Sequence, residues 1–398
     1  MINPSAHGWI DKFFVEQKDL PHLFPKSDLD FYIQTRATGF IYGHIISFDT
    51  PNDIVTKDRL PEEISKLGML NTLFQMYRLV KQDNDYSNFI NEAVAFYNTM
   101  IPRGFNPLKK VMESSSLSNK LEKFIHDRVQ TNEDLFSKNF SHVITNALLF
   151  IDVLAFKQHL EKGSLPEKYS TKIEDIVISI ISLSLKSKTV TSQHDDLLLK
   201  LFESSVRYNK FSPTNSNTIE TLDFSFLQND LEKYYVIDLA GISLWSDERV
   251  ENEERYFLYK LGEMIDVTDV FVLDSINFIN DFIVSYKNEI PYFNYSNPVK
   301  HFYEQTTESV ALLINRNKSR LLKELTQSKE LMHLLAKSTH KDLDKEEKKK
   351  VKKQLLDICK TVPSLTIFLL PGGSLLLPIL IKFIPTMLPS AFNENIED

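Results

Sequence analysis

Residues 64–80 read ISKLGMLNTLFQMYRLV, a pattern typical of an α-helix with one apolar face. Leu67, Leu70, Phe74 and Tyr77 recur at steps of three and four residues. An α-helix makes one turn every 3.6 residues, so this period places the four side chains on the same face. We therefore predict a helix here whose apolar face lies in a core.

Further stretches carry a related signal. Residues 143–156 place their apolar side chains on a wider stripe, which indicates a buried helix. Residues 176–185 fit a helix or a strand by periodicity, and their helical surroundings favour a helix. Strand patterns are sparse, and residues 38–48 are the best candidate for a short β-hairpin. Residues 163–166 are among the Gly- and Pro-containing breaks between elements. The predicted fold class is all-α, with a multi-helix body.

The composition is that of a globular protein and excludes several classes. The chain has 398 residues, of which 42% are hydrophobic and 25% charged, so collagen-like and wholly disordered chains are excluded. The single cysteine, Cys359, excludes a disulfide framework and a zinc site built from thiolates. The glycine-rich nucleotide-binding motifs Gly-x-Gly-x-x-Gly and Gly-x-x-x-x-Gly-Lys-Ser/Thr do not occur. Residues 1–14 lack a basic start and a long apolar run, so we expect the chain to begin in the cytosol.

Charge is distributed unevenly along the chain. The net charge is −8, yet residues 316–360 hold 14 Lys or Arg against 7 Asp or Glu, a difference of +7. An acidic body is therefore followed by a basic neck and a nearly uncharged tail. Such asymmetry points to contact with an anionic surface, either a membrane or a nucleic acid. We expect no nucleic-acid partner, because the surrounding body is acidic.

No motif predicts catalysis. The ten histidines are scattered, and no zinc-protease or serine-hydrolase motif appears. His194, Asp195 and Asp196 form the densest polar cluster, where the aspartates are best interpreted as helix caps. Cys359 is best interpreted as a small apolar side chain in a helix. The chain is therefore predicted not to be an enzyme and to need no cofactor.

One acidic motif leaves two interpretations open. Residues 235–267 place Asp247, Val250 and Glu254 between two apolar helices. Asp247 and Glu254 can serve as a helix cap and a first-turn carboxylate, and this interpretation is favoured. The alternative is that both help to bind a divalent cation through oxygen ligands. The spacing resembles the TerB-like (tellurite-resistance) helical domains, although Glu248 stands where that family usually has glycine.

The neck contains a lysine-rich helix. Residues 344–360 read DKEEKKKVKKQLLDICK, with Val351, Leu355, Ile358 and Cys359 on one helical stripe. A basic amphipathic helix beside an apolar segment is typical of contact with a membrane surface. The lysines assigned to this contact are Lys348, Lys349, Lys350, Lys352 and Lys353. The alternative is an ordinary solvated helix face.

The hydrophobic segment that follows favours the interpretation of membrane contact. Residues 361–391 contain one charged side chain, Lys382. As one straight helix they would be about 46 Å long, against a bilayer core of about 30 Å. Regularly spaced prolines exclude a straight helix and leave a kinked spanning helix or a re-entrant hairpin. A third interpretation is a soluble hairpin buried against the body. The basic neck would stay cytosolic if the segment spans the membrane.

These residues also carry a family resemblance. The matching positions are Gln354-Leu355-Leu356-Asp357, Lys360-x-x-Pro363, Pro371, Leu375-Leu376-Leu377-Pro378, Lys382, Pro385 and Met387-Leu388-Pro389-Ser390-x-Phe392. This spacing resembles the membrane segment of the LETM family, leucine zipper–EF-hand-containing transmembrane proteins. The start of the chain, Asn3-Pro4-Ser5-x-x-Gly8-Trp9, is similar to bacterial LETM-related proteins described as biofilm-associated.

The resemblance implies particular residues and roles. The membrane-segment residues are Pro363, Pro371, Gly372, Gly373, Ser374, Pro378, Lys382, Pro385 and Pro389. The family is linked to cation/proton exchange and to ribosome contact. Here Ser374 stands where the family has an acidic residue, and we expect the soluble domain that follows the family's membrane segment to be missing. The part of the family that this sequence resembles is therefore its membrane segment.

The sequence therefore predicts a non-enzymatic helical scaffold, anchored in the inner (cell) membrane with most of the chain in the cytoplasm. The predicted regions are helical residues 1–110 and 111–222, a TerB-like region 223–300, the basic neck 301–360 and the membrane segment 361–392. Expected partners are membrane lipid and either a second copy or an envelope protein, with a link to biofilm or surface behaviour. LETM-like cation/proton transport and a soluble helical binding module are the alternatives. A change of ion flux on mutating Ser374 would favour transport.

Overall fold

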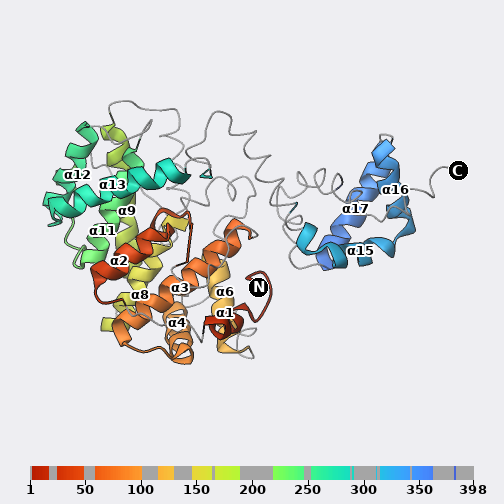
Figure 1. The fold of residues 1–398 in the computed structure, drawn as a ribbon, viewed down its shortest axis with the longest axis horizontal. Coiled ribbons are helices and arrows are strands. Elements are labelled where there is room, and N and C mark those ends of the chain that lie inside the picture. Colours follow the sequence, from red (N-terminus) through yellow and green to blue (C-terminus); the bar gives the residue numbers. More distant parts are fainter. Residues whose placement is uncertain are drawn as a thin grey trace. The chain divides into compact units, whose positions relative to one another are not determined.

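The computed structural model describes most of the helical body and part of the C-terminal region (Figure 1). The described residues are 2–17, 25–48, 59–100, 115–129, 146–163, 166–188, 218–245, 252–286, 289–290, 311, 314–340, 343–361 and 381. Every regular element within these ranges is a helix, so the all-α prediction is confirmed for them.

The helices fall into two compact units. The first holds α1 (Trp9–Gln17), α2 (Asp28–Ala37), η1 (Phe40–Tyr42), α3 (Pro61–Lys81), α4 (Tyr86–Met100), α6 (Leu117–Val129), α8 (Phe150–Lys162), α9 (Pro166–Ser187), η2 (Ile219–Thr221), α11 (Asp230–Leu244), α12 (Asn252–Met264) and α13 (Asp269–Tyr286). The second holds α15 (Lys318–Thr326), α16 (Lys329–His340) and α17 (Lys345–Thr361).

Two of the periodic stretches form the predicted helices, and the described part of the third, residues 143–156, is a regular helix only from Phe150, where α8 begins. Residues 64–80 lie within α3, and residues 176–185 lie within α9. The break at residues 163–166 is also confirmed. Helix α8 ends at Gly163, whose φ of +61° is the left-handed conformation common at helix C-termini. Helix α9 begins at Pro166, where a missing N–H costs nothing.

The predicted β-hairpin at residues 38–48 is wrong. The chain instead makes the short 3₁₀ helix η1 between Gly39 and Gly43, which have φ values of +79° and +73°. A Cβ on Gly39 would lie 2.0 Å from the carbonyl oxygen of His44, so only glycine fits this turn. The Ile46 N–H still bonds back to the Thr38 carbonyl at 2.9 Å. The chain reverses as the pattern suggested, but through a tight glycine-bounded turn without strands.

Helix α11 is central to the first unit. It packs against α9, α13, α12 and α2, and Figure 1 shows it among these helices. Because neighbours surround it, its apolar side chains are not confined to one face; Leu231, Tyr235, Ile237 and Leu244 are all buried. Helices from residues 1–110, 111–222 and 223–300 thus contribute to one hydrophobic core. The division into those three regions stays a prediction.

A buried polar network crosses this core. Asp238 of α11 is fully buried and accepts hydrogen bonds from the Tyr32 hydroxyl (2.7 Å) and from Ser275. The Arg36 guanidinium lies 3.9 Å from the same carboxylate and donates to Asp274. Burial raises the pKa of Asp238, and the positive charge of Arg36 opposes that shift. The network joins α2, α11 and α13, and removing one charged partner from a buried pair typically costs about 3–5 kcal/mol.

The second unit is built around its own apolar cluster. Its buried members are Ile314, Leu321, Leu325, Leu331, Met332, Leu334, Leu335, Leu343, Val351, Leu355 and Cys359. They come from α15, α16 and α17 and from residues next to them, so these three helices pack on one another.

The stability of the first unit should depend on pH through His44. Its side chain is 21% exposed and packs beside Phe282 and Tyr286. Burial lowers its pKa from 6.5 to about 4, because the exposed Glu289 at 3.8 Å does too little to offset desolvation. The folded state therefore binds fewer protons than the unfolded state between those pH values. We expect the free energy of unfolding to fall by up to about 3 kcal/mol as pH drops from about 6.5 to about 4.

Urea unfolding across this pH range measures the effect. The variant His44→Gln should lose most of the slope, whereas His7→Gln, at a side chain that is 99% exposed, is the control and should keep it. An unchanged slope in His44→Gln would contradict the assignment.

Candidate functional site

Helix α17 carries the lysines that the sequence assigns to a membrane surface. Its start is fixed by a reciprocal pair of hydrogen bonds, in which the Asp344 carboxylate accepts from the Glu347 N–H (2.8 Å) and the Glu347 carboxylate accepts from the Asp344 N–H (3.0 Å). This capping box satisfies two backbone donors at the helix terminus. Glu347 also accepts a hydrogen bond from Lys337 of α16. The first turn of α17 is therefore tied to its neighbour.

The apolar stripe of α17 is not on the surface. Val351, Leu355 and Cys359 are each 0% exposed and belong to the core that α17 shares with α15 and α16. Burial raises the pKa of the Cys359 thiol to about 12, so the thiol stays protonated and unreactive near neutral pH. The stripe is used for internal packing, so α17 meets its surroundings through its other side chains.

The lysines of α17 face solvent. Lys348, Lys349, Lys350, Lys352 and Lys353 are all exposed. The Lys350 ammonium donates to Glu330 of α16 at 3.0 Å. None of the ion pairs in the described part of the chain uses the other four. These four, Lys348, Lys349, Lys352 and Lys353, are called the lysine face below, and they lie within about 8 Å along the helix axis at 1.5 Å per residue.

Glu330 of α16 links this helix to α17 through hydrogen bonds. One of its oxygens accepts from Lys350, and the other accepts from the Gln354 amide at 3.0 Å. The Ser328 hydroxyl donates to the Gln354 carbonyl oxygen at 2.8 Å. The hydrogen bonds from Lys350 and Gln354 hold the pKa of Glu330 below its usual value. These contacts between α16 and α17 therefore use one of the five lysines and leave the lysine face outside the ion pairs of the described residues.

The predicted membrane segment lies almost wholly outside the described residues, including all nine of its assigned positions from Pro363 to Pro389. Ile381 is described; it is helical, half-buried and packed against the apolar core of the second unit. Among the helices of the described ranges, none combines the length and apolar character of a membrane span.

The acidic motif is divided between described and undescribed positions. Asp247 lies outside the described residues, whereas Glu254 lies in the first turn of α12 and is buried. That position matches the first-turn carboxylate of the favoured interpretation. Within the described ranges no cluster of three His, Cys, Asp or Glu side chains could hold a metal ion. The His194-Asp195-Asp196 cluster also lies outside these ranges.

Residues 343–398 match the family model described as LETM1-like, RBD. This stretch is related to the LETM family. The LETM-like stretch begins two residues before α17 and includes the hydrophobic segment, so it holds both the lysine face and the proline-rich positions. It does not reach the helical body, where the TerB-like and biofilm-associated resemblances stay predictions. No curated protein and no solved structure matches this chain.

Sequence reasoning missed how α17 is used. The periodicity placed Val351, Leu355 and Cys359 on one stripe, but a stripe is compatible with both a protein core and a lipid surface. The complementary stripe of α16, with Leu331, Leu334 and Leu335, was a signal that could have decided between them.

We expect Leu355→Ala to destabilise the three-helix unit by about 2–5 kcal/mol, because it removes a fully buried side chain from a packed core. Hydrogen exchange of the α17 amides in the full chain measures this locally. The matched control is Leu356→Ala, the same change at a half-buried neighbour, which should cost less. Equal exchange rates in the two variants would contradict the packing of α17.

Proposed function

We propose that this protein is a non-enzymatic helical scaffold held at a membrane by its LETM-like stretch. In this proposal the hydrophobic segment 361–392 enters the bilayer, which requires Ile381 to leave the core of the second unit on which it packs in the structure. The lysine face of α17 contacts anionic headgroups beside it. The observation that carries the proposal is the two-sidedness of α17, whose apolar stripe is buried while four lysines stay exposed without ion pairs.

The contact in this proposal is electrostatic. Because Val351 and Leu355 are buried in the second unit, α17 does not insert an apolar face between lipids. Each lysine close to an anionic leaflet contributes about 1 kcal/mol, so the lysine face supplies about 4 kcal/mol at most. That is too little for a lasting anchor, which requires a second signal. The adjoining hydrophobic segment is that second signal, and the lysine face orients the protein.

The proposed location and partners follow from the position of the lysine face beside the hydrophobic segment. Basic residues next to a membrane segment stay on the cytosolic side, so the helical body lies in the cytoplasm and the anchor in the inner membrane. The body then presents its surface to a second copy or to an envelope protein, and a role in biofilm or surface behaviour belongs to this proposal. LETM-like cation/proton transport is the alternative that the family resemblance implies, and its polar positions would be Gly373, Ser374 and Lys382.

The lysine face is tested by a fourfold variant with Lys348, Lys349, Lys352 and Lys353 each changed to Gln. We expect the full chain to bind vesicles containing phosphatidylserine more tightly than vesicles of phosphatidylcholine alone. The variant should lose most of that preference, because its four charges are gone. Rising salt should weaken the preference of the unmodified chain, because exposed charges are screened beyond about 10 Å at 0.1 M. Vesicle co-sedimentation over a salt series measures both effects.

A matched control removes four exposed lysines of the helical body, at Lys26, Lys162, Lys172 and Lys186. It changes the net charge by the same amount but should leave the preference intact. If the control loses as much preference as the lysine-face variant, overall charge and not α17 sets the binding. If neither variant changes the preference, the lysine face makes no membrane contact.

A further inference from the structure

Helix α13 of the first unit is packed on two faces and exposed on a third. A Cβ on Gly241 of α11 would lie 2.5 Å from Ile279, and a Cβ on Gly262 of α12 would lie 2.8 Å from Val272, so both helices pack closely on α13. On another face Ser275 joins the buried polar network of the core. These contacts hold α13 in place, so its exposed face is a preformed surface.

The exposed face of α13 carries apolar side chains. Val270, Leu273 and Val284 are 79%, 44% and 57% exposed, and the exposed Asn277 lies between them in the sequence. On a helix of 3.6 residues per turn, these four positions fall within about 60° of arc. Exposed apolar side chains are ordinary when scattered, whereas several gathered on one face mark an interaction site. These four residues are called the α13 stripe below.

The spacing of the α13 stripe fits a second helix. Its steps of three, four and seven residues place Val270, Asn277 and Val284 at position a of a heptad and Leu273 at position d. A helix laid along such a seam inserts its own side chains between them. The stripe spans 14 residues, or about 21 Å at 1.5 Å per residue. It therefore accommodates a helix of about four turns, with a polar side chain opposite Asn277.

Carboxylates border the α13 stripe on both sides. The helical period places Asp269 on one side and Asp274 and Asp281 on the other, and all three are exposed. Asp274 accepts a hydrogen bond from Arg36. In the part of the chain that the structure describes, Asp269 and Asp281 take part in no ion pair. Helix α13 contains no Lys or Arg, so the border of the stripe is negatively charged.

We propose that the α13 stripe docks a basic amphipathic helix of a partner protein. Such a helix covers the apolar side chains and places Lys or Arg against the bordering carboxylates, which is electrostatic complementarity. A second copy docked through the same face would bring the carboxylates of both chains together, and like charges facing each other across an interface are unfavourable. An anionic membrane surface would repel the same carboxylates.

This docking goes beyond the membrane contact proposed for the lysine face. The α13 stripe belongs to the first unit, whereas the lysine face belongs to the second. Loss of one contact therefore leaves the other intact, and the two proposals are tested by separate variants.

The test uses the full chain in a non-ionic detergent and a fluorescent peptide of three heptads. The peptide has Leu or Ile at positions a and d, one Asn at the central a position, and Lys at positions e and g. Fluorescence anisotropy should show binding that weakens as salt rises. A second peptide with Glu in place of each Lys should bind at least about tenfold more weakly. Because both peptides have the same apolar stripe, the pair also controls for uptake into detergent micelles.

Two double variants test the two features of the surface. The stripe variant, Val270→Ser with Leu273→Ser, should raise the Kd for the basic peptide by about tenfold, because apolar contact area is lost. The border variant, Asp269→Asn with Asp281→Asn, should remove most of the salt dependence. Neither variant should change the melting temperature of the free protein appreciably, because all four side chains are exposed. Hydrogen exchange should show that the basic peptide protects the α13 amides.

Matched controls make the same changes elsewhere in the first unit. Val15→Ser with Leu117→Ser removes an exposed valine and an exposed leucine, and Glu16→Gln with Asp127→Asn removes two exposed carboxylates. Both controls should leave peptide binding unchanged. Absence of binding, equal binding of the two peptides, or binding that survives both the stripe and the border variants would overturn the proposal. Self-association of the full chain that the stripe variant abolishes would instead assign this face to a second copy. Protection of the α13 amides by anionic vesicles would assign it to a membrane.

Discussion

The burial of Val351, Leu355 and Cys359 against α15 and α16 decides how the C-terminal end of this protein can act. A lysine-rich helix with a free apolar stripe would lie in the surface of a bilayer. Here the stripe is already used, so only the exposed side chains of α17 remain available. What that side offers is charge, and charge acts over a distance set by salt and with an energy of about 1 kcal/mol per lysine. This makes α17 an orienting element that works beside an anchor.

The first unit follows a different principle, in which a buried carboxylate gathers partners from several helices. Asp238 is fully buried, yet Tyr32, Ser275 and Arg36 surround it. Such a network specifies how α2, α11 and α13 meet, because a shift of one helix would leave a charge unpaired. Helix α2 is thus tied to α11 and α13 through Tyr32 and Arg36.

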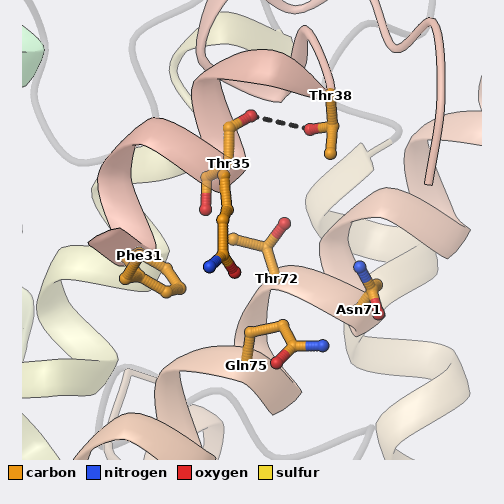
Figure 2. Close-up of a pocket in the computed structure, with 7 residues that line it drawn as sticks. Phe31, Thr35, Thr38, Asn71, Thr72 and Gln75 are labelled. Atoms are coloured by element: carbon orange, nitrogen blue, oxygen red, sulfur yellow. Dashed lines mark hydrogen bonds between the residues drawn. The ribbon is translucent and has the colours of Figure 1, made fainter. Parts of the chain in front are cut away.

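The sequence predicted the helices well where one signal dominated. Residues 64–80 carried a clear period, and Gly163 and Pro166 marked a helix end and a helix start. Residues 38–48 misled, because the backbone there follows Gly39 and Gly43, which bound a tight turn in place of the predicted hairpin. The pairing of Lys350 with Glu330 depends on how α16 meets α17, and periodicity within one helix does not contain that information. A small polar cavity between α2 and α3 (Figure 2) was missed for the same reason, since its lining residues, within 31–38 and 71–75, come together only in the fold.

The most direct test of the account is alkaline carbonate extraction of membranes from cells that express either the full chain or a chain truncated after Lys360. The account predicts that the full chain stays in the membrane pellet and that the truncated chain is released, because the lysine face alone binds too weakly and too superficially to resist carbonate. Release of the full chain as readily as the truncated one would contradict an inserted anchor. It would favour a soluble binding module whose hydrophobic segment packs on the protein itself, as Ile381 does on the second core.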